Sequence, residues 1–354
     1  MLSLGSSVVS TASSAHGASF TKIGAGACGT IFAQDGRSRV YKLCKTDQHE
    51  FLWNDYTAHN NIANCFKEYR VEKISIPSCY YFSPHHDARF FNEHPGLIEA
   101  AKEKCNLPTS VLVTERIPAL PEPTRHLLID TYCATINREK AKADVANKDC
   151  LVRVYLGSTQ GRSSMKFFSL RNFKLHLNQV LELGLDAKTL AQRMGIAMAV
   201  IHWAAKKDAR DVEFVLGSSS ETTPPALGSA EVENMKPMTY TGPSSRKNED
   251  FFRQITKLWV LDFNQVRPIT MDKVGVAEAV QAAKVNDPYI PKPLQKSAKE
   301  KELWNAFALK YLEMAHTILK GQEPEVMKLP VLFLRGLVDV EREKRGLAEE
   351  AGSA

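Results

Sequence analysis

Closely spaced cysteines are missing from this sequence. Its seven cysteines are scattered from position 28 to position 150, and no two form a Cys-x-x-Cys pair. Structural zinc modules depend on closely spaced Cys and His ligands, so this spacing argues against one. An odd number of scattered thiols is typical of a reducing compartment, and we expect reduced cysteines and a cytoplasmic location.

Long apolar runs are also absent. The longest one, residues 194–205, contains His202 and is shorter than the ~20 residues that a membrane-spanning helix needs. Residues 1–19 have no Lys, Arg, Asp or Glu, so they match neither a secretory signal nor a mitochondrial presequence. No repeat period is found, which excludes coiled-coil and solenoid folds. We expect a globular chain with a disordered tail at residues 1–19.

What is present is an ordinary globular composition. The 354 residues are 44 % hydrophobic and 24 % charged, which is enough to bury a sizeable core, and the length predicts about two domains. The formal charge of +6 is compatible with a nucleic-acid partner, although a mildly basic surface often has no polyanion partner.

Sequence patterns predict a strand-rich first region. Three short strands surround a glycine-rich turn, a helix follows, and a buried strand precedes a stretch that prolines break. The strands are 20–23, 30–33 and 39–44, the helix is 50–69 with Phe51, Tyr56, Ile62 and Phe66 on one face, and the buried strand is 110–117. The prolines at 118–123 mark a boundary, which gives an N-lobe of residues 20–117 and a C-lobe of residues 118–354.

The second region is predicted to be mainly helical. Apolar residues recur at helical spacing in residues 170–183, 190–201, 274–284 and 300–319, and residues 258–262 read as a strand. Residues 218–250 differ, because sixteen of these 33 residues are Ser, Thr, Pro or Gly. This composition buries too little apolar surface to offset its ordering entropy, so we predict a disordered insertion.

A glycine motif follows the first predicted strand. Residues 24–29 read Gly-x-Gly-x-x-Gly, and glycines let the backbone approach a phosphate closely. In a dinucleotide-binding fold this motif opens a helix, but here Thr30 and Ile31 continue as strand formers. Gly24, Gly26 and Gly29 therefore predict a hairpin loop of the protein-kinase kind, with a plain glycine turn as the alternative.

A lysine stands in the next strand. Lys42 follows Gly29 by thirteen residues and lies in an apolar strand, where a charge is costly unless it is paired. In protein kinases such a lysine contacts the nucleotide phosphates and a glutamate on a helix, and Glu50 is the nearest candidate partner. A surface lysine on an edge strand is the alternative.

Residues 207–216 resemble the catalytic loop of protein kinases. Asp208 takes the position of the catalytic aspartate, Arg210 that of the basic residue two positions on, and Glu213 that of the metal-binding asparagine. Two departures are clear, because His202 stands six residues before Asp208 rather than two, and glutamate replaces asparagine.

A fourth motif follows the predicted strand at 258–262. Asp262 begins an Asp-Phe-Asn sequence that resembles the kinase Asp-Phe-Gly, with Asn264 in place of glycine. Four such motifs in the kinase order, over residues 20–268, resemble a protein kinase. The resemblance implies an α+β, two-lobed protein-kinase-like fold with a small β-rich N-lobe, a larger helical C-lobe and the chemistry between them.

Two segments also resemble a fungal family with a degenerate kinase-like fold. They are Asp-Ala-Arg-Asp-Val-Glu-Phe-Val-Leu-Gly at 208–217 and Leu-Trp-Val-Leu-Asp-Phe-Asn-Gln-Val-Arg-Pro-Ile at 258–269, and the likeness continues through Asn-Asp-Pro-Tyr at 286–289. This family includes the arginine-containing cyclodipeptide synthases, which make cyclo-arginyl dipeptides from aminoacyl-tRNAs. Some members are described as zinc-finger proteins, which the cysteines here do not support.

This resemblance implies acyl transfer between aminoacyl-tRNAs, including arginyl-tRNA, with no ATP or metal cofactor and with no membrane or DNA partner. Acidic side chains would hold the arginyl guanidinium or act as a general base. The candidate catalytic residues are Asp208, Glu213 and Asp262, and the candidate substrate-binding residues are Asp211, Arg210, Asn264, Lys42 and Glu50. Candidates for tRNA phosphates are Arg138, Lys140, Lys142, Lys206, Lys207, Lys296, Lys299 and Lys301, with a solvated basic face as the alternative.

Two other functions stay open. In a kinase for a small molecule or protein, Lys42 would bind the ATP phosphates while Glu213 and Asp262 hold magnesium. In a pseudokinase, the same fold would only bind a partner. Cys28 is expected to be a small buried thiol rather than an aminoacyl carrier, and we expect His202, Trp203 and Trp259 to be structural.

Overall fold

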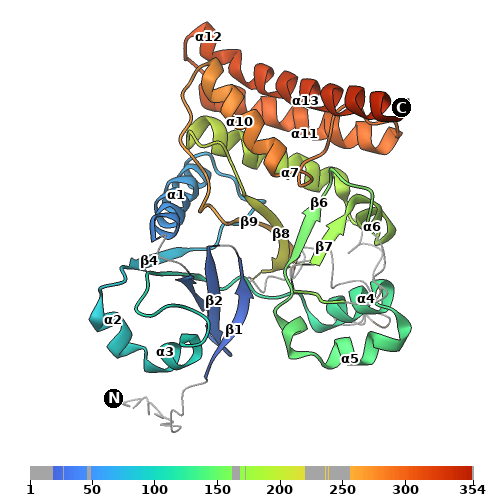
Figure 1. Ribbon diagram of the computed structural model, residues 1–354. Coiled ribbons are helices and arrows are strands. Elements are labelled where there is room, and N and C mark those ends of the chain that lie inside the picture. Colours follow the sequence, from blue (N-terminus) through green and yellow to red (C-terminus); the bar gives the residue numbers. More distant parts are fainter. Residues whose placement is uncertain are drawn as a thin grey trace, which may run out of the picture.

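The computed structural model describes residues 19–26, 28–45, 49–161, 168–171, 173–219, 236, 238 and 256–352. Nearly all of the predicted tail and most of the predicted insertion lie outside these residues. The protein belongs to the mixed α+β class, with a sheet-rich N-terminal region and a helical C-terminal part (Figure 1). Within the described ranges, no helix has the length and apolar character needed to cross a membrane.

The first sheet has five antiparallel strands in the order β1-β2-β3-β5-β4. Their bounds are β1 Phe20–Ala25, β2 Gly29–Gln34, β3 Arg39–Cys44, β4 Cys79–Ser83 and β5 Val111–Glu115. Between β1 and β2 the backbone N–H of Gly26 donates to the carbonyl of Gly29 at 2.9 Å. The glycine motif therefore forms the predicted hairpin and does not open a helix.

Three helices accompany this sheet: α1 His49–Glu68, α2 Ala88–Glu93 and α3 Pro95–Ala101. The buried face of α1 contains Ile62 and Phe66 as predicted, whereas Phe51 is 38 % exposed, so the prediction for Phe51 is wrong. Leu52 takes the inward position instead, one residue further along the helix. Phe90 of α2 and Leu97 of α3 pack on the sheet.

The second sheet has the strand order β7-β6-β8-β9, with β6 Val152–Tyr155, β7 Phe173–His176, β8 Glu213–Ser218 and β9 Thr256–Leu261. The single helix predicted over 170–183 is wrong in its first half, because β7 pairs with β6 in parallel and only α6, Leu177–Glu182, is helical. Short apolar segments fit both periodicities, and pairing with a neighbouring strand decides between them.

The other helices of the C-terminal part lie on both sides of the second sheet: in Figure 1, α4 and α5 are below it, and α7 and α10 to α13 are above it. They are α4 Glu122–Tyr132, α5 Arg138–Ala143, α7 Ala187–Ala199, α10 Lys273–Val285, α11 Ala298–Leu319, α12 Pro324–Met327 and α13 Leu329–Gly352. Two short 3₁₀ turns occur at Thr135–Asn137 and Val145–Asp149, and α7 ends in a π turn at Val200–Ala204. At Gly195 a side chain would strike the carbonyl of Phe307, so this glycine permits the close crossing of α7 and α11.

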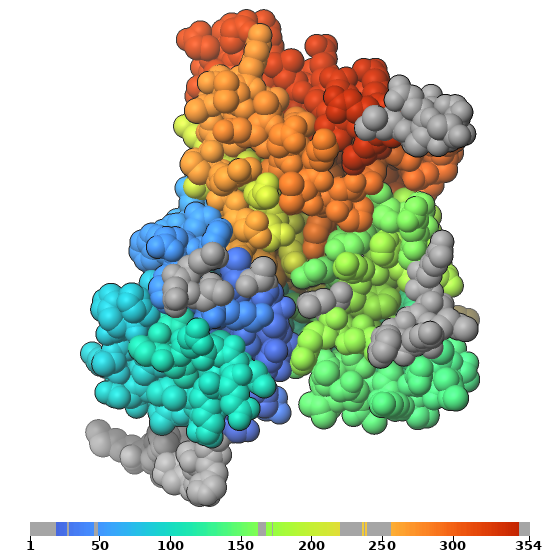
Figure 2. Space-filling model, viewed as in Figure 1, coloured from blue at the N-terminus to red at the C-terminus, as the bar shows by residue number. Residues whose placement is uncertain are grey.

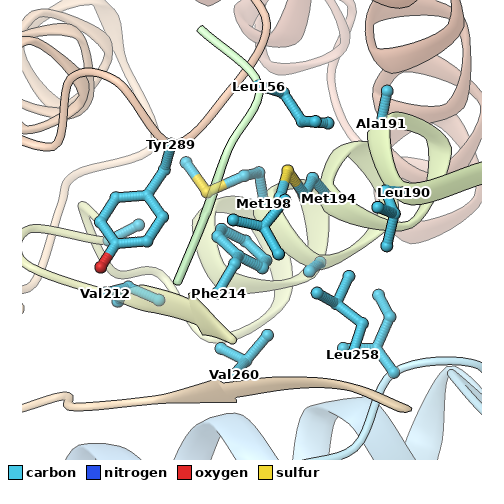
Figure 3. Packing of buried hydrophobic residues seen from close by; sticks show 14 of the residues in the cluster. Leu156, Leu190, Ala191, Met194, Met198, Val212, Phe214, Leu258, Val260 and Tyr289 are labelled. Carbon is cyan, nitrogen blue, oxygen red and sulfur yellow. The ribbon is translucent and has the colours of Figure 1, made fainter. Parts of the chain in front are cut away.

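The main core lies between the second sheet and α7 (Figure 3). Met194 and Met198 of α7 lie over Phe214 of β8 and Leu258 of β9. This packing positions β8 and β9, whose ends carry the acidic residues described next.

Candidate functional site

Lys42 lies on β3 in the middle of the first sheet, opposite Ile31 of β2 and Leu112 of β5. Its ammonium Nζ lies 2.6 Å from Asp55 Oδ2 and 2.8 Å from Asp262 Oδ1. The predicted pairing with Glu50 is wrong, because Glu50 is exposed in the first turn of α1 and Asp55 occupies the inward face five residues later.

The two carboxylates set the charge of this lysine. Burial alone lowers the pKa of Lys42, but the carboxylates of Asp262 and Asp55 outweigh burial and hold that pKa above its ordinary value. Lys42 is therefore a permanent cation between two anions. This largely buried triad links β3, α1 and the residue that follows β9.

The adjacent Asn54 and Asp55 also hold the loop after β9. Asp55 Oδ1 accepts from the backbone N–H of Phe263 at 3.1 Å. The amide of Asn54 donates to the carbonyls of Asn264 at 3.0 Å and Val266 at 2.9 Å. Neither residue was predicted from the sequence. Asn and Asp are unfavourable inside helices, so an Asn-Asp pair within a predicted helix was an indication that these side chains have a specific role.

Glu213 and Asp262 come together through the β8–β9 pairing. Glu213 begins β8 directly opposite Leu261, and Asp262 follows Leu261 at the end of β9. Glu213 also forms an ion pair with Arg153 of β6, a residue that the motifs did not reveal.

Glu213 has a strongly shifted ionisation. Burial raises the pKa of Glu213 to about 7, Arg153 opposes this rise, and the nearby charges of Asp262 and Asp211 add to it. A carboxyl group that titrates near neutrality can both accept and donate a proton under cellular conditions.

Asp208 does not lie at the cleft surface. Its side chain is fully buried, and Oδ2 accepts from Arg267 Nε at 2.8 Å. Oδ1 accepts from the backbone N–H groups of Arg267 at 2.9 Å and Arg210 at 3.0 Å. The carboxylate at the predicted catalytic position is therefore saturated by protein donors and anchors the loop.

Asp211 lies three residues further on. Its Oδ2 accepts from Gln265 Nε2 at 2.6 Å, and burial together with the charge of Asp262 raises the pKa of the Asp211 carboxyl. The half-buried Arg210 lies close enough to lower that pKa in part. Asp211, rather than Asp208, is therefore the aspartate of this loop that interacts electrostatically with Asp262.

The loops that carry these aspartates have unusual backbones. Ala209, Asp211 and Asp262 have φ of 58°, 63° and 66°, a left-handed region that costs non-glycine residues about 1 kcal/mol or more. Asn286 clamps the first loop, since its amide donates to Ala209 O and accepts from Asp211 N, both at 2.6 Å. Strained residues of this kind concentrate at functional sites.

The glycine loop covers the acidic end. Gly24 and Gly26 line the cleft, while a side chain at Gly29 would lie 3.0 Å from both Leu43 O and Lys42 Cγ. Gly29 therefore permits β2 to lie close against the strand that carries Lys42. Partial burial raises the pKa of the Cys28 thiol. The expectation that this thiol is buried is wrong, because Cys28 is partly exposed and lies near the charges of Lys42 and Asp262.

A cleft lies between the first sheet and the second, and in Figure 2 it opens between the blue and green parts of the chain. Its inner end is charged and is lined by Lys42, Asp55, Asp262, Glu213 and Arg153. Its middle is apolar and is lined by Ile31, Val40, Leu112, Ile117, Leu151 and Val215. The cleft thus offers an elongated ligand an apolar stretch that leads to an acidic end.

Burial agrees with the structural role predicted for His202, Trp203 and Trp259. His202 is fully buried and hydrogen-bonds the hydroxyl of Tyr311 at 2.9 Å through Nδ1. Burial lowers its pKa to about 3, so the ring is neutral near pH 7. Trp203 and Trp259 are 2 % and 4 % exposed, which confirms both as core residues. All seven cysteines are free thiols.

Comparison with known families gives one partial match. The family DUF3669, described as "Zinc finger protein", matches residues 258–323. That segment contains no cysteine and the single histidine His316, so it lacks the ligands of a zinc finger. In the described ranges no group of three or more His, Cys, Asp or Glu side chains is placed to hold a metal ion. The comparisons with curated proteins and with solved structures gave no match.

Proposed function

We propose that this protein is a cytoplasmic, aminoacyl-tRNA-dependent cyclodipeptide synthase that makes cyclo-arginyl dipeptides for fungal secondary metabolism, on a two-lobed fold of the protein-kinase kind. The observation that carries the proposal is the inner end of the cleft. There Glu213 and Asp262 lie close to Asp211, while Asp208 is buried under Arg267. The sequence resemblance at 208–217 and 258–269 suggests the reaction class, and the geometry of the cleft supports the roles proposed for its residues.

The acidic end suits a guanidinium group. Asp262 and Glu213 line the cleft, and Asp211 adds a third nearby acidic group. A carboxylate binds a guanidinium through two parallel hydrogen bonds, which fixes both position and orientation. The side chain of an arginyl group would thus enter the cleft and exchange contacts with the carboxylate that Lys42 now holds.

Glu213 has the ionisation that the acyl transfer requires. The attacking α-amine must lose a proton as its nitrogen bonds to the ester carbonyl and the ribose hydroxyl of the donor tRNA leaves. A base whose pKa is about 7 accepts that proton and returns it to the leaving hydroxyl at neutral pH. The same exchange closes the ring when the second amine attacks the second ester.

Lys42 completes the site electrostatically. Its ammonium lies 2.8 Å from Asp262 and is held in place by Asp55. A fixed cation beside the reacting ester stabilises the negative charge that develops on the carbonyl oxygen. This role needs no nucleotide and uses the lysine as a fixed charge.

Phosphoryl transfer from ATP fits this site less well. The aspartate at the position of the kinase base is saturated by Arg267 and Arg210. At the two positions of the kinase metal ligands, Glu213 is paired with Arg153 and Asp262 with Lys42. Magnesium, like an arginyl guanidinium, would have to displace these cations, so the buried Asp208 is the observation that disfavours the kinase. A kinase remains the second candidate because the triad of Lys42, Asp55 and Asp262 resembles the phosphate-binding centre of kinases.

The proposal is tested by incubating the purified protein with a mixture of aminoacylated tRNAs and analysing the small molecules by mass spectrometry. We expect a cyclic dipeptide that contains arginine, formed in the presence of EDTA, lost after ribonuclease treatment and independent of added ATP. Asp262→Asn and Glu213→Gln should each lower the rate at least a hundredfold, since both remove a group from the reacting end.

A matched control is Asp339→Asn, which removes an exposed carboxylate paired with Arg342 far along α13 and should leave the rate unchanged. Cyclic dipeptide formation at the wild-type rate by Asp262→Asn would contradict the role of the acidic end. Absence of any cyclic dipeptide, together with magnesium-dependent consumption of ATP, would replace the synthase by the kinase. Absence of both activities would favour a binding module.

A further inference from the structure

The cleft continues outward into a second hollow. Glu115, Arg116, Asp149 and Arg171 line both the outer end of the cleft and this hollow, so the two form one continuous surface. We call the second one the outer hollow; it is lined in addition by Lys22, Arg37 and Lys148. These residues come from β1, the turn between β2 and β3, and the 3₁₀ turn at Val145–Asp149.

The outer hollow carries an excess of positive charge. Its five cationic residues outnumber its three acidic ones, and the eight are Lys22, Arg37, Arg116, Lys148, Arg171, Asp35, Glu115 and Asp149. Arg116 is neutralised by Asp149 at 2.8 Å. Lys22, Arg37 and Lys148 form no ion pair within the described part of the chain. Arg171 donates through its terminal nitrogen to Lys22 O at 3.3 Å, but its buried Nε has no hydrogen-bond partner among the described residues. A buried donor without a partner is costly, and a bound anion would satisfy it.

Two basic residues outside the hollow differ from most of those in it, because they already form ion pairs. Of the residues that the sequence analysis offered for tRNA phosphates, Lys142 pairs with Asp130 at 2.8 Å and Lys299 pairs with Glu302 at 2.9 Å. A lysine that already has an acidic partner contributes less to binding of a polyanion. The outer hollow therefore offers a better phosphate site than these two lysines, and it is directly connected to the cleft.

The segment between the two charged ends is apolar. Val40, Leu112, Ile117 and Val215 line it. A flat aromatic base fits such a slot between two sheets, since every base has an apolar face. The basic hollow, the apolar slot and the acidic end thus follow one another along the cleft. The phosphate, the base and the cationic aminoacyl group follow one another in the same order at the 3′ end of an aminoacylated RNA.

We propose that the outer hollow binds the phosphates of the single-stranded 3′ end of an RNA, and that the terminal nucleoside occupies the apolar slot. The inference rests on the proposed function, since it places the acyl ester of the RNA beside Lys42 and Glu213. It also names the surface that the sequence did not reveal, on Lys22, Arg37, Lys148 and Arg171.

The test measures binding of a fluorescent single-stranded RNA that ends in CCA, by anisotropy over a range of salt concentrations. The full-length double variant Lys148→Gln/Arg171→Gln should bind about tenfold more weakly, and its slope of log affinity against log salt should be smaller by about 1.4. The matched control Lys142→Gln/Lys299→Gln removes two paired lysines elsewhere and should bind like the wild type. Circular dichroism and the urea midpoint confirm that both variants are folded.

The outcomes separate this inference from the proposed function. If the hollow variant binds RNA as tightly as the wild type, the inference is overturned, whether or not cyclic dipeptide is made. If the hollow variant loses RNA binding but the wild type makes no cyclic dipeptide, the RNA site stands and the synthase assignment fails. Binding of ATP without any binding of the RNA would also overturn the inference, because the hollow would then serve a free nucleotide.

Discussion

The helical core and the cleft each bury a titratable residue, and burial moves the two pKa values in opposite directions. His202 in the core has its pKa lowered to about 3, while Glu213 in the cleft has its pKa raised to about 7. In both places desolvation disfavours the charged form. His202 is therefore neutral near pH 7, whereas Glu213 is about half ionised at that pH.

Burial alone therefore does not identify a functional residue. His202 hydrogen-bonds the neutral hydroxyl of Tyr311 and packs against the rings of Trp203 and Phe333. Glu213 lies in an open cleft beside Arg153 and close to the charges of Asp262 and Asp211. Several converging charges in a cleft, together with a shifted pKa, distinguish a reactive group from a structural one.

The largest expected effect tests whether Asp208 belongs with His202 or with Glu213. Asp208→Asn removes the charge that three donors from Arg267 and Arg210 hold in a fully buried position. We expect the free energy of unfolding to fall by about 3 kcal/mol, measured by urea denaturation. Asp211→Asn, three residues away, should cost less than about 1 kcal/mol yet abolish product formation. If Asp208→Asn and Asp211→Asn lowered the free energy of unfolding equally, Asp208 could not be distinguished as the structural aspartate and Asp211 as the reactive one.

The next effect concerns acid stability of the core. The pKa of His202 is depressed in the folded state, so its contribution is complete above about pH 6.5 and is lost as the pH falls toward about 3. Compared with His202→Gln, the wild type should lose about 3 kcal/mol of unfolding free energy between about pH 6.5 and about pH 4. Denaturant titrations at several pH values measure this difference. A difference independent of pH would show that the ring protonates freely in the folded protein.

Glu213 should show the opposite dependence. Its folded pKa is raised, so its contribution is complete below about pH 4.5 and is lost as the pH rises through about 7. Relative to Glu213→Gln, the wild type should lose about 2 kcal/mol over that window, a value reduced for the partial solvent exposure of the side chain. If Glu213 is the base, the wild-type rate should rise through the same window. A rate independent of pH in the wild type would exclude that role.

Much of the fold could be predicted from local patterns. Residues 39–44 match β3, and the helices at 274–284 and 300–319 lie within α10 and α11. β7 could not be identified in advance, because its strand character depends on parallel pairing with β6 rather than on its own sequence. Periodicity reports which face is buried, but pairing between distant segments decides the conformation of short segments.

The site was predictable to a lesser extent. The motifs brought Lys42 and Asp262 together correctly, since their charged atoms lie 2.8 Å apart. Glu50 was predicted as the partner of Lys42 because it is the nearest glutamate in the sequence. The partner is Asp55, because Asp55 lies on the face of α1 that points toward the lysine. Arg153 carried no motif and reaches Glu213 only because β6 pairs with β8. Residues that act through tertiary neighbours leave little local signal.

The smallest effect tests how closely the glycine loop controls the inner end of the cleft. Gly29→Ala adds a carbon 3.0 Å from Leu43 O and Lys42 Cγ, a contact that forces β2 or the lysine to shift by a few tenths of an ångström. We expect a loss of about 1 kcal/mol in unfolding free energy. The pKa of Glu213 should shift in the pH–rate profile, because the charge of Lys42 acts on it.

Gly26→Ala is the matched control in the same motif, because a side chain there meets nothing within 4 Å. It should leave both the urea midpoint and the pH–rate profile within error of the wild type. If the two variants behave alike, the motif serves only as a flexible turn. If only Gly29→Ala shifts the pH–rate profile, the hairpin sets the distance between the ammonium of Lys42 and the carboxyl of Glu213. Such control by a neighbouring charge distinguishes Glu213 in the cleft from His202 in the core.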